Sequence, residues 1–165
     1  MVNLKNVIFH FNKSSFNYDK KSKNFPWSLI RNKEAKYIIN FIGNVKNKII
    51  LDIGCGTGYY SKMMVKKNAQ KVYALDTSIK MLNQIKQKKI ITICKNAEFF
   101  NIKKKFEIII CAGIFEFVNS PLKVLKNARK VAKDYCKMVI LYPIDNFMAQ
   151  IYKFYHLTHK IKINL

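Results

Sequence analysis

The sequence predicts a single α/β domain built on a doubly wound, mostly parallel sheet of about five strands. Three observations lead to this fold class. Short segments that are apolar at nearly every position alternate with segments whose apolar residues recur at helical spacing. The chain has 165 residues, 50% of them hydrophobic, which suffices for one core but not for two. A glycine-rich turn follows the first apolar segment, and ligands of such sheets bind where the strands end.

The first part of the chain is predicted to differ from the rest. Residues 1–30 are polar and show no sustained period, so we expect an N-terminal arm or lid that lies on the domain formed by residues 31–165. The expected anchors of this arm are the aromatic residues Phe11, Phe16, Tyr18 and Trp27. From Asn32 to Ile42 the apolar positions follow helical spacing, and Gly43 suits a left-handed helix end. One amphipathic helix is therefore predicted before the sheet.

Five later segments are predicted as strands because they are apolar on both faces, as in a sheet covered by helices. These segments are Lys48 to Ile53, Lys71 to Leu75, Ile90 to Cys94, Glu107 to Ala112 and Lys137 to Tyr142. Helices are predicted between them, at Ser61 to Lys67, Ser78 to Lys88 and Pro121 to Lys133. The dipeptide Ser120-Pro121 is typical of a helix start.

The composition is strongly basic. The chain has 31 Lys+Arg against 9 Asp+Glu, a net charge of +22 that attracts polyanions non-specifically. Nearly all of these basic residues are lysines spread along the whole sequence, and the arginines are Arg31 and Arg129. A dedicated nucleic-acid surface would use more arginine, whose planar fork pairs with phosphate and guanine. We expect most of this charge to be solvated surface and keep RNA as an alternative partner.

The cysteines indicate neither a metal site nor a disulfide framework, because they form no CxxC pair and no cluster with histidine. They are Cys55, Cys94, Cys111 and Cys136. No apolar stretch approaches the ~18 residues of a membrane-spanning helix. The opening MVNLKNVIFHF is interrupted by polar residues before a signal-peptide core can form. We therefore expect a cytoplasmic protein without a membrane span and without a metal.

The most informative segment is ILDIGCGTG, residues 50–58. Its alternate glycines permit positive φ and a close approach of a ligand, which a β-carbon at Gly54 or Gly56 would obstruct. Asp76 ends the next strand, where a carboxylate can accept hydrogen bonds from both hydroxyls of a ribose. A dinucleotide fold would place its third glycine at position 59, beside a pyrophosphate. The spacing GxGxG therefore predicts a nucleoside ligand without phosphates.

The segments LDIGCGTG and VYALD resemble the first two motifs of the class I S-adenosylmethionine-dependent methyltransferases, and the resemblance covers residues 18–143. It implies a Rossmann-like methyltransferase fold and S-adenosylmethionine as cofactor. By this resemblance Asp52 would orient the turn and help to hold the cofactor's amino group. Gly54 and Gly56 would border its methionine part, Asp76 would bind its ribose and Thr77 would lie beside the adenine. The same turn also contains the remaining candidates Cys55 and Gly58.

Two further segments carry candidate cofactor residues by the same resemblance. After the third strand the family places an acid and a small residue that contact adenine, and this chain has Asn96-Ala97-Glu98 there. Asn96 can accept through its carbonyl oxygen, although less strongly than a charged group, and Glu98 is the alternative acceptor. The end of the fourth strand, at Cys111, resembles the segment whose backbone faces the methionine part and the methyl group.

Methyl transfer from a sulfonium is an in-line displacement, so holding the nucleophile in line supplies much of the catalysis and a base is optional. No Asn/Asp-Pro-Pro-Tyr segment follows the fourth strand, and neither Cys111 nor Cys136 has the adjacent proline of a cytosine-methylating nucleophile, so both are expected to be buried thiols. His156 and His159 are candidates for a base or, alternatively, surface histidines of the tail. Tyr18 is a candidate for closing over the cofactor or for anchoring the arm.

We expect a small-molecule acceptor, because the first 45 residues form a modest lid and no separate RNA-binding module is evident. One alternative is an RNA methyltransferase or RNA-associated subunit that uses the lysine-rich surface. The other is a truncated, non-catalytic protein that binds the cofactor or a partner. The family continues past the fifth strand with a helix and two strands, whereas here only a helix over residues 145–157 and the opening of a strand at residues 161–165 are predicted. The fifth strand would then be an exposed edge, open to a partner chain or to self-association.

Overall fold

The computed structural model describes residues 2–25, 27–142 and 156 of the chain. Within these ranges one sheet has the order β3-β2-β1-β4-β5, and all neighbouring strands are parallel. The strands are β1 (Ile49–Ile53), β2 (Lys71–Asp76), β3 (Ile90–Cys94), β4 (Phe106–Ala112) and β5 (Ala132–Leu141). The predicted doubly wound α/β sheet of about five strands is confirmed. Its strand order reverses between β1 and β4, which makes this the switch point where ligands bind in such sheets.

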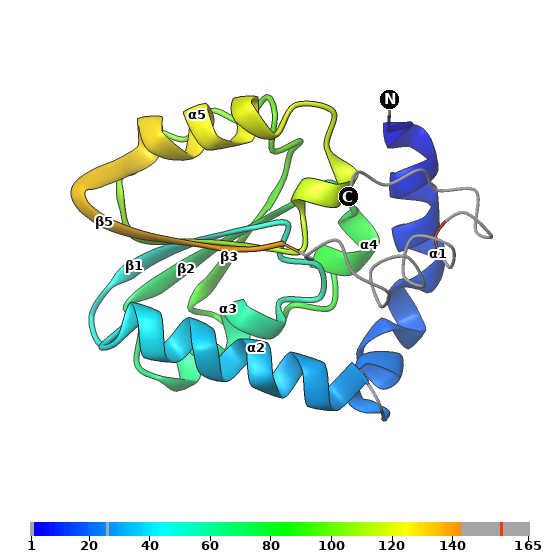
Figure 1. Ribbon diagram of the computed structural model, residues 1–165, viewed down its shortest axis with the longest axis horizontal. Helices are drawn as coiled ribbons and strands as arrows, with labels where there is room; N and C mark the ends of the chain where they lie inside the picture. The colour runs from blue at the N-terminus through cyan, green and yellow to red at the C-terminus, as the bar shows by residue number, and fades with distance from the viewer. Residues whose placement is uncertain (1, 26, 143–155, 157–165) are drawn as a thin grey trace.

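Helices cover both faces of the sheet and the end at which its strands finish (Figure 1). α2 (Trp27–Ile42) and α3 (Tyr59–Lys66) lie on one face, and α5 (Pro121–Val131) lies on the other. At the carboxyl end of the strands lie α1 (Leu4–Lys23), the short α4 (Ile79–Leu82) and a 3-10 turn, η1 (Phe115–Phe117). This end of the sheet is therefore covered by the N-terminal helix.

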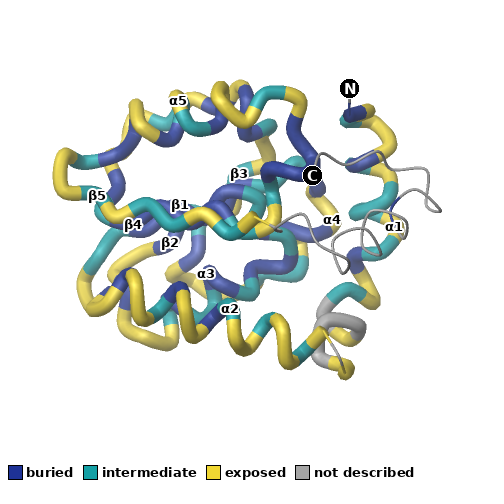
Figure 2. Tube along the Cα trace, viewed as in Figure 1, coloured by how far each residue is buried: buried dark blue, intermediate teal, exposed yellow. Residues whose placement is uncertain are grey.

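Two apolar clusters fill the space on either side of the sheet, and successive strand residues alternate between them. In β4, Ile108 and Ile110 pack on the side of α2 and α3, whereas Ile109 packs on the side of α5. All three are at most 3% exposed, and Figure 2 shows the inner strands as the buried centre of the molecule. Burial on both faces is the reason that these strands are continuously apolar.

The first thirty residues were expected to form an arm that gains structure by lying on the domain, without a helix being predicted there, and the structure shows that most of them form α1, a helix of 20 residues. Polar contacts attach α1 to α4 and its surroundings. The Ser78 hydroxyl donates to Asn12 Oδ1 at 2.6 Å, and Gln84 Nε2 donates to the Ser15 carbonyl at 2.7 Å. Val7 and Phe11 add apolar contacts to Phe117, but two such residues do not mark a helical period in the sequence.

The predicted aromatic anchors of this segment behave differently from one another. The Phe11 ring lies 5.1 Å from the ring of Phe117 in η1, so Phe11 does contact the domain. Phe16 is 88% exposed and anchors nothing within the described chain. Trp27 belongs to α2, which begins earlier than the predicted Asn32, and is exposed.

Two other predicted elements have different bounds. The helix predicted over residues 78–88 is only α4, in which the Ser78 side chain accepts from the backbone N–H of Met81 at 3.2 Å. β5 begins directly after α5, earlier than the predicted Lys137, and the pairing of β4 with β5 is irregular between Phe106 and Ile108. The helix predicted over residues 145–157 and the strand predicted at residues 161–165 lie outside the described residues, apart from His156.

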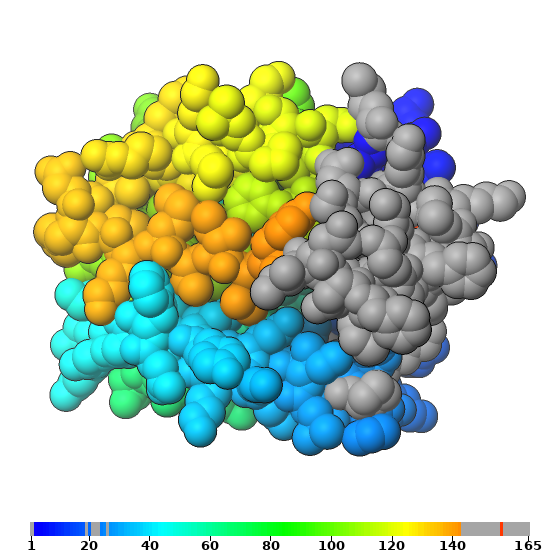
Figure 3. All heavy atoms as spheres, in the orientation of Figure 1, coloured from blue at the N-terminus to red at the C-terminus, as the bar shows by residue number. Residues whose placement is uncertain are grey.

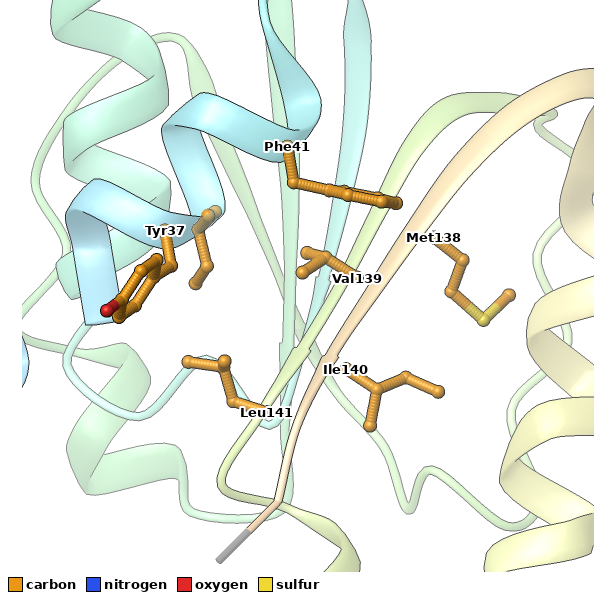
Figure 4. Close-up of a pocket in the computed structure, with 7 residues that line it drawn as sticks. Tyr37, Phe41, Met138, Val139, Ile140 and Leu141 are labelled. Carbon is orange, nitrogen blue, oxygen red and sulfur yellow. The ribbon is translucent and has the colours of Figure 1, made fainter. Parts of the chain in front are cut away.

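β5 lies at the edge of the sheet and, among the described strands, pairs only with β4. Figure 3 shows it at the surface between α2 and α5. An apolar groove of about 270 Å³ runs between α2 and β5 (Figure 4). It is lined by Tyr37, Ile38, Phe41, Met138, Val139, Ile140 and Leu141. That this edge receives a partner chain or a second copy stays a prediction.

Candidate active site

The glycine turn leaves the carboxyl end of β1 at the switch point. The backbone N–H groups of Gly54 and Cys55 both donate to the carbonyl of Leu75, at 2.8 and 3.0 Å, so the turn is bound to the end of β2. Gly54, Gly56 and Gly58 have φ values of 74°, 54° and 80°. Residues with a β-carbon rarely adopt such values, so the backbone itself requires glycine at these three positions.

The three glycines differ in what lies beside them. A β-carbon at Gly54 would lie 2.7 Å from the side chain of Ile114, and one at Gly58 would lie 2.7 Å from that of Ile85. The expectation that a β-carbon at Gly54 would obstruct a ligand is therefore wrong, because the protein's own side chain fills that space. A β-carbon at Gly56 would meet no atom within 4 Å. Gly56 is thus the position where a ligand can approach the backbone.

Asp52 lies near the end of β1 and is 1% exposed. Its Oδ2 accepts hydrogen bonds from the backbone N–H of Ser61 at 3.1 Å and from the Ser61 hydroxyl at 2.6 Å. Burial raises the pKa of Asp52 to about 6, although the two bonds from Ser61 act in the opposite direction. Asp52 therefore ties β1 to α3. Its expected role toward a cofactor's amino group stays a prediction.

Asp76 ends β2 beside the open side of the turn. Its Oδ2 accepts from the backbone N–H of Gly56 at 2.9 Å, and its Oδ1 accepts from the backbone N–H of Ser78 at 2.8 Å. Burial raises the pKa of Asp76, opposed by these backbone bonds. Each carboxylate oxygen has a second lone pair and can accept a further hydrogen bond. Asp76 and Gly56, the two features predicted from the sequence, are thus in direct contact, and Thr77 follows at the same edge.

The candidate adenine residues after β3 are engaged within the protein. Asn96 Oδ1 accepts from the backbone N–H of Glu98 at 2.7 Å. The Glu98 carboxylate accepts from the backbone N–H groups of Ser120 at 2.9 Å and Asn119 at 3.3 Å. Glu98 therefore caps the start of α5, and its expected role as the alternative acceptor for adenine stays a prediction. Ala97, between them, is 2% exposed.

Both buried cysteines near the turn remain protonated thiols. Cys111 in β4 is fully buried, and burial together with the charge of Asp52 raises its pKa to about 12. Burial also raises the pKa of Cys55, and Asp52 and Asp76 add to the effect. A thiol with a raised pKa is a poor nucleophile, so Cys111 can serve a ligand only through its backbone.

The structure describes two of the three candidate catalytic residues, His156 and Tyr18. The interpretation of His156 as a surface residue is wrong, because it is 4% exposed and its ring lies 5.3 Å from that of Phe117. His159 lies outside the described residues. Tyr18 lies on α1, with its ring 5.5 Å from the guanidinium carbon of Arg31.

Within the described ranges no group of three His, Cys, Asp or Glu side chains could hold a metal, and no helix is long and apolar enough to cross a membrane.

The sequence did not indicate two acidic residues beside the start of α3. Glu34 in α2 accepts a 3.1 Å hydrogen bond from the Tyr60 hydroxyl, and burial raises the pKa of Glu34. Glu116 in η1 is 2% exposed, and burial raises its pKa to about 7, with the charge of Glu34 contributing. Among the described residues no donor reaches Glu116 Oε2. Glu116 follows the end of β4, so the segment CAGIFEF could have singled it out, whereas nothing in the sequence marks Glu34.

Comparison with known proteins identifies the family. The sequence matches the family described as DREV methyltransferase over residues 28–158. It is 31% identical over 96 residues to a tRNA U34 carboxymethyltransferase of Campylobacter jejuni subsp. doylei (54% of this chain, 33% of that protein). It is 31% identical over 134 residues to a ubiquinone biosynthesis O-methyltransferase of Coxiella burnetii (77% of this chain, 56% of that protein). The chain thus spans about a third to somewhat over half of these relatives.

Solved structures agree in fold. A magnesium protoporphyrin IX methyltransferase of Synechocystis with bound SAH is 18% identical, with a TM-score of 0.63 over 79% of this chain and 68% of that one. An S-adenosylmethionine-dependent methyltransferase of Methanococcus maripaludis is 21% identical, with a TM-score of 0.67 over 90% of this chain and 71% of that one. At these identities the likeness shows the fold alone, and it is the Rossmann-like methyltransferase fold that the sequence motifs implied. The family is shown by the match over residues 28–158, and the chain belongs to the DREV methyltransferase family.

Proposed function

We propose that the protein binds S-adenosylmethionine at the glycine turn and transfers its methyl group to a small-molecule acceptor. The contact between Gly56 and Asp76 carries this proposal. Gly56 borders open space and donates its N–H to Asp76, whose oxygens can each accept one more hydrogen bond. A ribose lying on this backbone could place its two hydroxyls on that carboxylate. Membership of the methyltransferase family supports this choice of nucleoside.

The charges around the turn also suit this ligand. S-adenosylmethionine supplies a methyl group on a positively charged sulfur. Glu34 and Glu116 are carboxylates whose ionisation is opposed by burial, and a nearby cation would favour their charged forms. The protein's own contribution to the reaction is to hold the acceptor in line with the methyl group and to exclude water. α1 lies at the carboxyl end of the sheet (Figure 1), where we expect it to shield this site.

Calorimetry with S-adenosylmethionine tests the cofactor site. We expect binding by the wild type and a loss of affinity on the order of 10- to 100-fold in Asp76→Asn, because a charged acceptor of two hydrogen bonds is replaced by a neutral one. Asp134→Asn is the matched control, since Asp134 is fully exposed on β5 and should leave affinity unchanged. Circular dichroism would establish that both variants fold. No heat with the wild type at millimolar ligand would refute the proposal.

A small-molecule acceptor is supported by the lid-like position of α1 and by relatives named for small acceptors. Besides the ubiquinone enzyme, a malonyl-[acyl-carrier protein] O-methyltransferase of Priestia megaterium is 28% identical over 81% of this chain, although only 49% of that protein is covered. A screen of small acceptors with methyl-labelled cofactor would test this proposal. Cofactor binding without transfer to any acceptor would favour the non-catalytic alternative.

RNA is the second candidate acceptor. It is favoured by the net charge of +22 and by the match to a tRNA U34 carboxymethyltransferase. A gel-shift assay with tRNA over a salt series separates the two candidates, because purely non-specific attraction by lysines falls steeply with salt. Affinity that persists at physiological salt would favour RNA, and affinity that disappears there would count against it.

A further inference from the structure

The outer face of α1 carries a row of alternating lysine and phenylalanine side chains, which we call the Lys/Phe stripe. Its members, which are all exposed, are Lys5, Phe9, Lys13, Phe16 and Lys20. At about 100° of rotation per helical residue, these five positions fall within a sector of about 80°. At a rise of about 1.5 Å per residue, the stripe is about 22 Å long.

The stripe lies on the side of α1 that faces away from the rest of the protein. Val7 and Ser15 are buried and Phe11 packs against Phe117, so the opposite side of the helix attaches it to the domain. Phe9 and Phe16, in contrast, are 70% and 88% exposed. Apolar side chains exposed singly are common, but a contiguous exposed patch marks an interaction surface. The stripe is therefore a candidate for binding a partner.

The exposed apolar surface continues beyond the end of α1. Four apolar residues that connect α1 to the first turn of α2 are exposed as well, and we call them the α1–α2 corner. They are Phe25 (80%), Trp27 (46%), Leu29 (61%) and Ile30 (39%). The stripe and the corner together follow one continuous stretch of chain, from residue 5 to residue 30.

The charge of this stretch selects an anionic partner. The sequence of α1 contains five lysines and one acidic residue, and the whole chain has a net charge of +22. Lysine can lay its aliphatic stem along apolar neighbours and hold its ammonium group at the level of phosphates. Anionic membranes and nucleic acids are the two large polyanions that such a surface can meet.

The aliphatic residues of the corner favour a membrane over RNA. Single-stranded nucleic acid is bound by aromatic rings on which bases stack, and Leu29 and Ile30 offer no ring. Leucine, isoleucine, phenylalanine and tryptophan all enter the boundary between lipid headgroups and acyl chains. Lysines beside them add attraction to anionic headgroups. A lipid surface therefore accounts for both kinds of exposed side chain.

We propose that the Lys/Phe stripe and the α1–α2 corner bind the surface of a membrane that contains anionic lipids. The association is peripheral, since no helix in the described part of the chain could cross a bilayer. Because α1 lies at the carboxyl end of the sheet (Figure 1), this binding turns that end of the protein toward the lipid. The proposal does not depend on which ligand occupies the glycine turn.

Co-sedimentation with vesicles at physiological salt tests the role of charge. The wild type should bind vesicles of phosphatidylcholine mixed with phosphatidylserine, and should not bind vesicles of phosphatidylcholine alone. Replacing the three lysines of the stripe by glutamine should weaken binding on the order of 100-fold, at about fivefold per lysine. The control removes the same charge from three exposed lysines of α5, Lys123, Lys126 and Lys130, and should lose less than about fivefold.

The apolar part of the surface is tested with phenylalanine variants. Phe9→Ser/Phe16→Ser should weaken vesicle binding at least about 10-fold, because both rings leave the lipid boundary. Phe99→Ser/Leu122→Ser is the control, since these residues are 68% and 59% exposed elsewhere and should not affect binding. Phe9→Leu/Phe16→Leu should keep most of the affinity, because leucine enters lipid although it cannot stack on a base. Circular dichroism would establish that all variants fold.

A second readout comes from the single tryptophan of the chain, Trp27, which lies in the corner. Its emission should shift to shorter wavelength with the mixed vesicles. A wild type that ignores these vesicles would overturn the proposal. So would equal losses in the two lysine variants together with no loss in Phe9→Ser/Phe16→Ser, which would mean attraction by charge alone. Loss of tRNA affinity in both phenylalanine variants, with vesicle binding unchanged, would assign the stripe to RNA instead.

Discussion

Replacing Glu116 by glutamine should stabilise the protein above neutral pH. Glu116 is 2% exposed, and burial raises its pKa from 4.5 to about 7. One pKa unit corresponds to about 1.4 kcal/mol, so ionised Glu116 lowers the free energy of unfolding by about 3 kcal/mol. Because the pKa is raised on folding, the contribution of the neutral acid is complete below pH 4.5 and is lost as the pH rises through 7. Glutamine cannot ionise and avoids this loss.

Urea unfolding of wild type and Glu116→Gln at about pH 5 and about pH 8 measures the effect. The difference in stability between variant and wild type should increase by about 2–3 kcal/mol from the lower to the higher pH. For a protein of this size, that corresponds to an increase of about 4–12 °C in the difference between their melting temperatures. Comparing the two pH values removes any constant change in packing caused by the substitution.

Glu107→Gln is the control with the opposite sign. Glu107 Oε2 accepts from the backbone N–H of Ile49 at 2.7 Å, and its Oε1 lies 3.5 Å from Lys133 and 3.6 Å from Lys48. Partial burial raises the pKa of Glu107, but these partners outweigh it and the net pKa is lowered. Its ionised form therefore stabilises the protein above its ordinary pKa, and Glu107→Gln should lose stability at pH 8, on the order of 1 kcal/mol. If Glu116→Gln shifted with pH in this same direction, the reasoning about Glu116 would be refuted.

Three further predictions concern the turn and the thiols. Ser61→Ala removes the 2.6 Å bond to buried Asp52 and should lower the free energy of unfolding by about 2 kcal/mol in urea; an unchanged midpoint would contradict this role. Gly58→Ala places a β-carbon against the side chain of Ile85 at a φ of 80°. Thermal unfolding should therefore show that the free energy of unfolding falls by at least about 1–2 kcal/mol. An unchanged free energy would exclude this strain. Cys94 is exposed and should react with a disulfide reagent before unfolding, whereas Cys111 should react only after it; equal rates would show that Cys111 is accessible.

The sheet could be predicted because its strands are buried on both faces, so that consecutive residues in the sequence are apolar. Ile108, Ile109 and Ile110 alternate between the two clusters, and only a strand covered on both faces requires three adjacent apolar side chains. α1 could not be predicted in this way, since much of its attachment is through hydrogen bonds of Asn12 and Ser15. Its apolar contacts, from Val7 and Phe11 to Phe117, are too few to mark an apolar stripe in the sequence.

Part of the candidate site could likewise be predicted from the sequence, and part could not. Gly56 and Asp76 could be paired from the sequence, because the ends of neighbouring parallel strands must meet at one edge. The filling of the space at Gly54 by Ile114 and the capping of α5 by Glu98 could not, because each depends on which side chain arrives from a distant segment. Sequence spacing therefore located the site, and tertiary packing decided which residues remain available in it.

The distribution of unmet charge points to the same end of the sheet. At the amino end of the strands, Glu107 has a backbone donor and two lysines, so its charge is compensated within the protein. At the carboxyl end, Arg31 Nη1 and Glu116 Oε2 are both buried without partners among the described residues. Buried polar atoms without hydrogen-bond partners lower stability. One donor and one acceptor left without partners at this end of the sheet are explained if a ligand that carries an acceptor and a donor or cationic group completes the site.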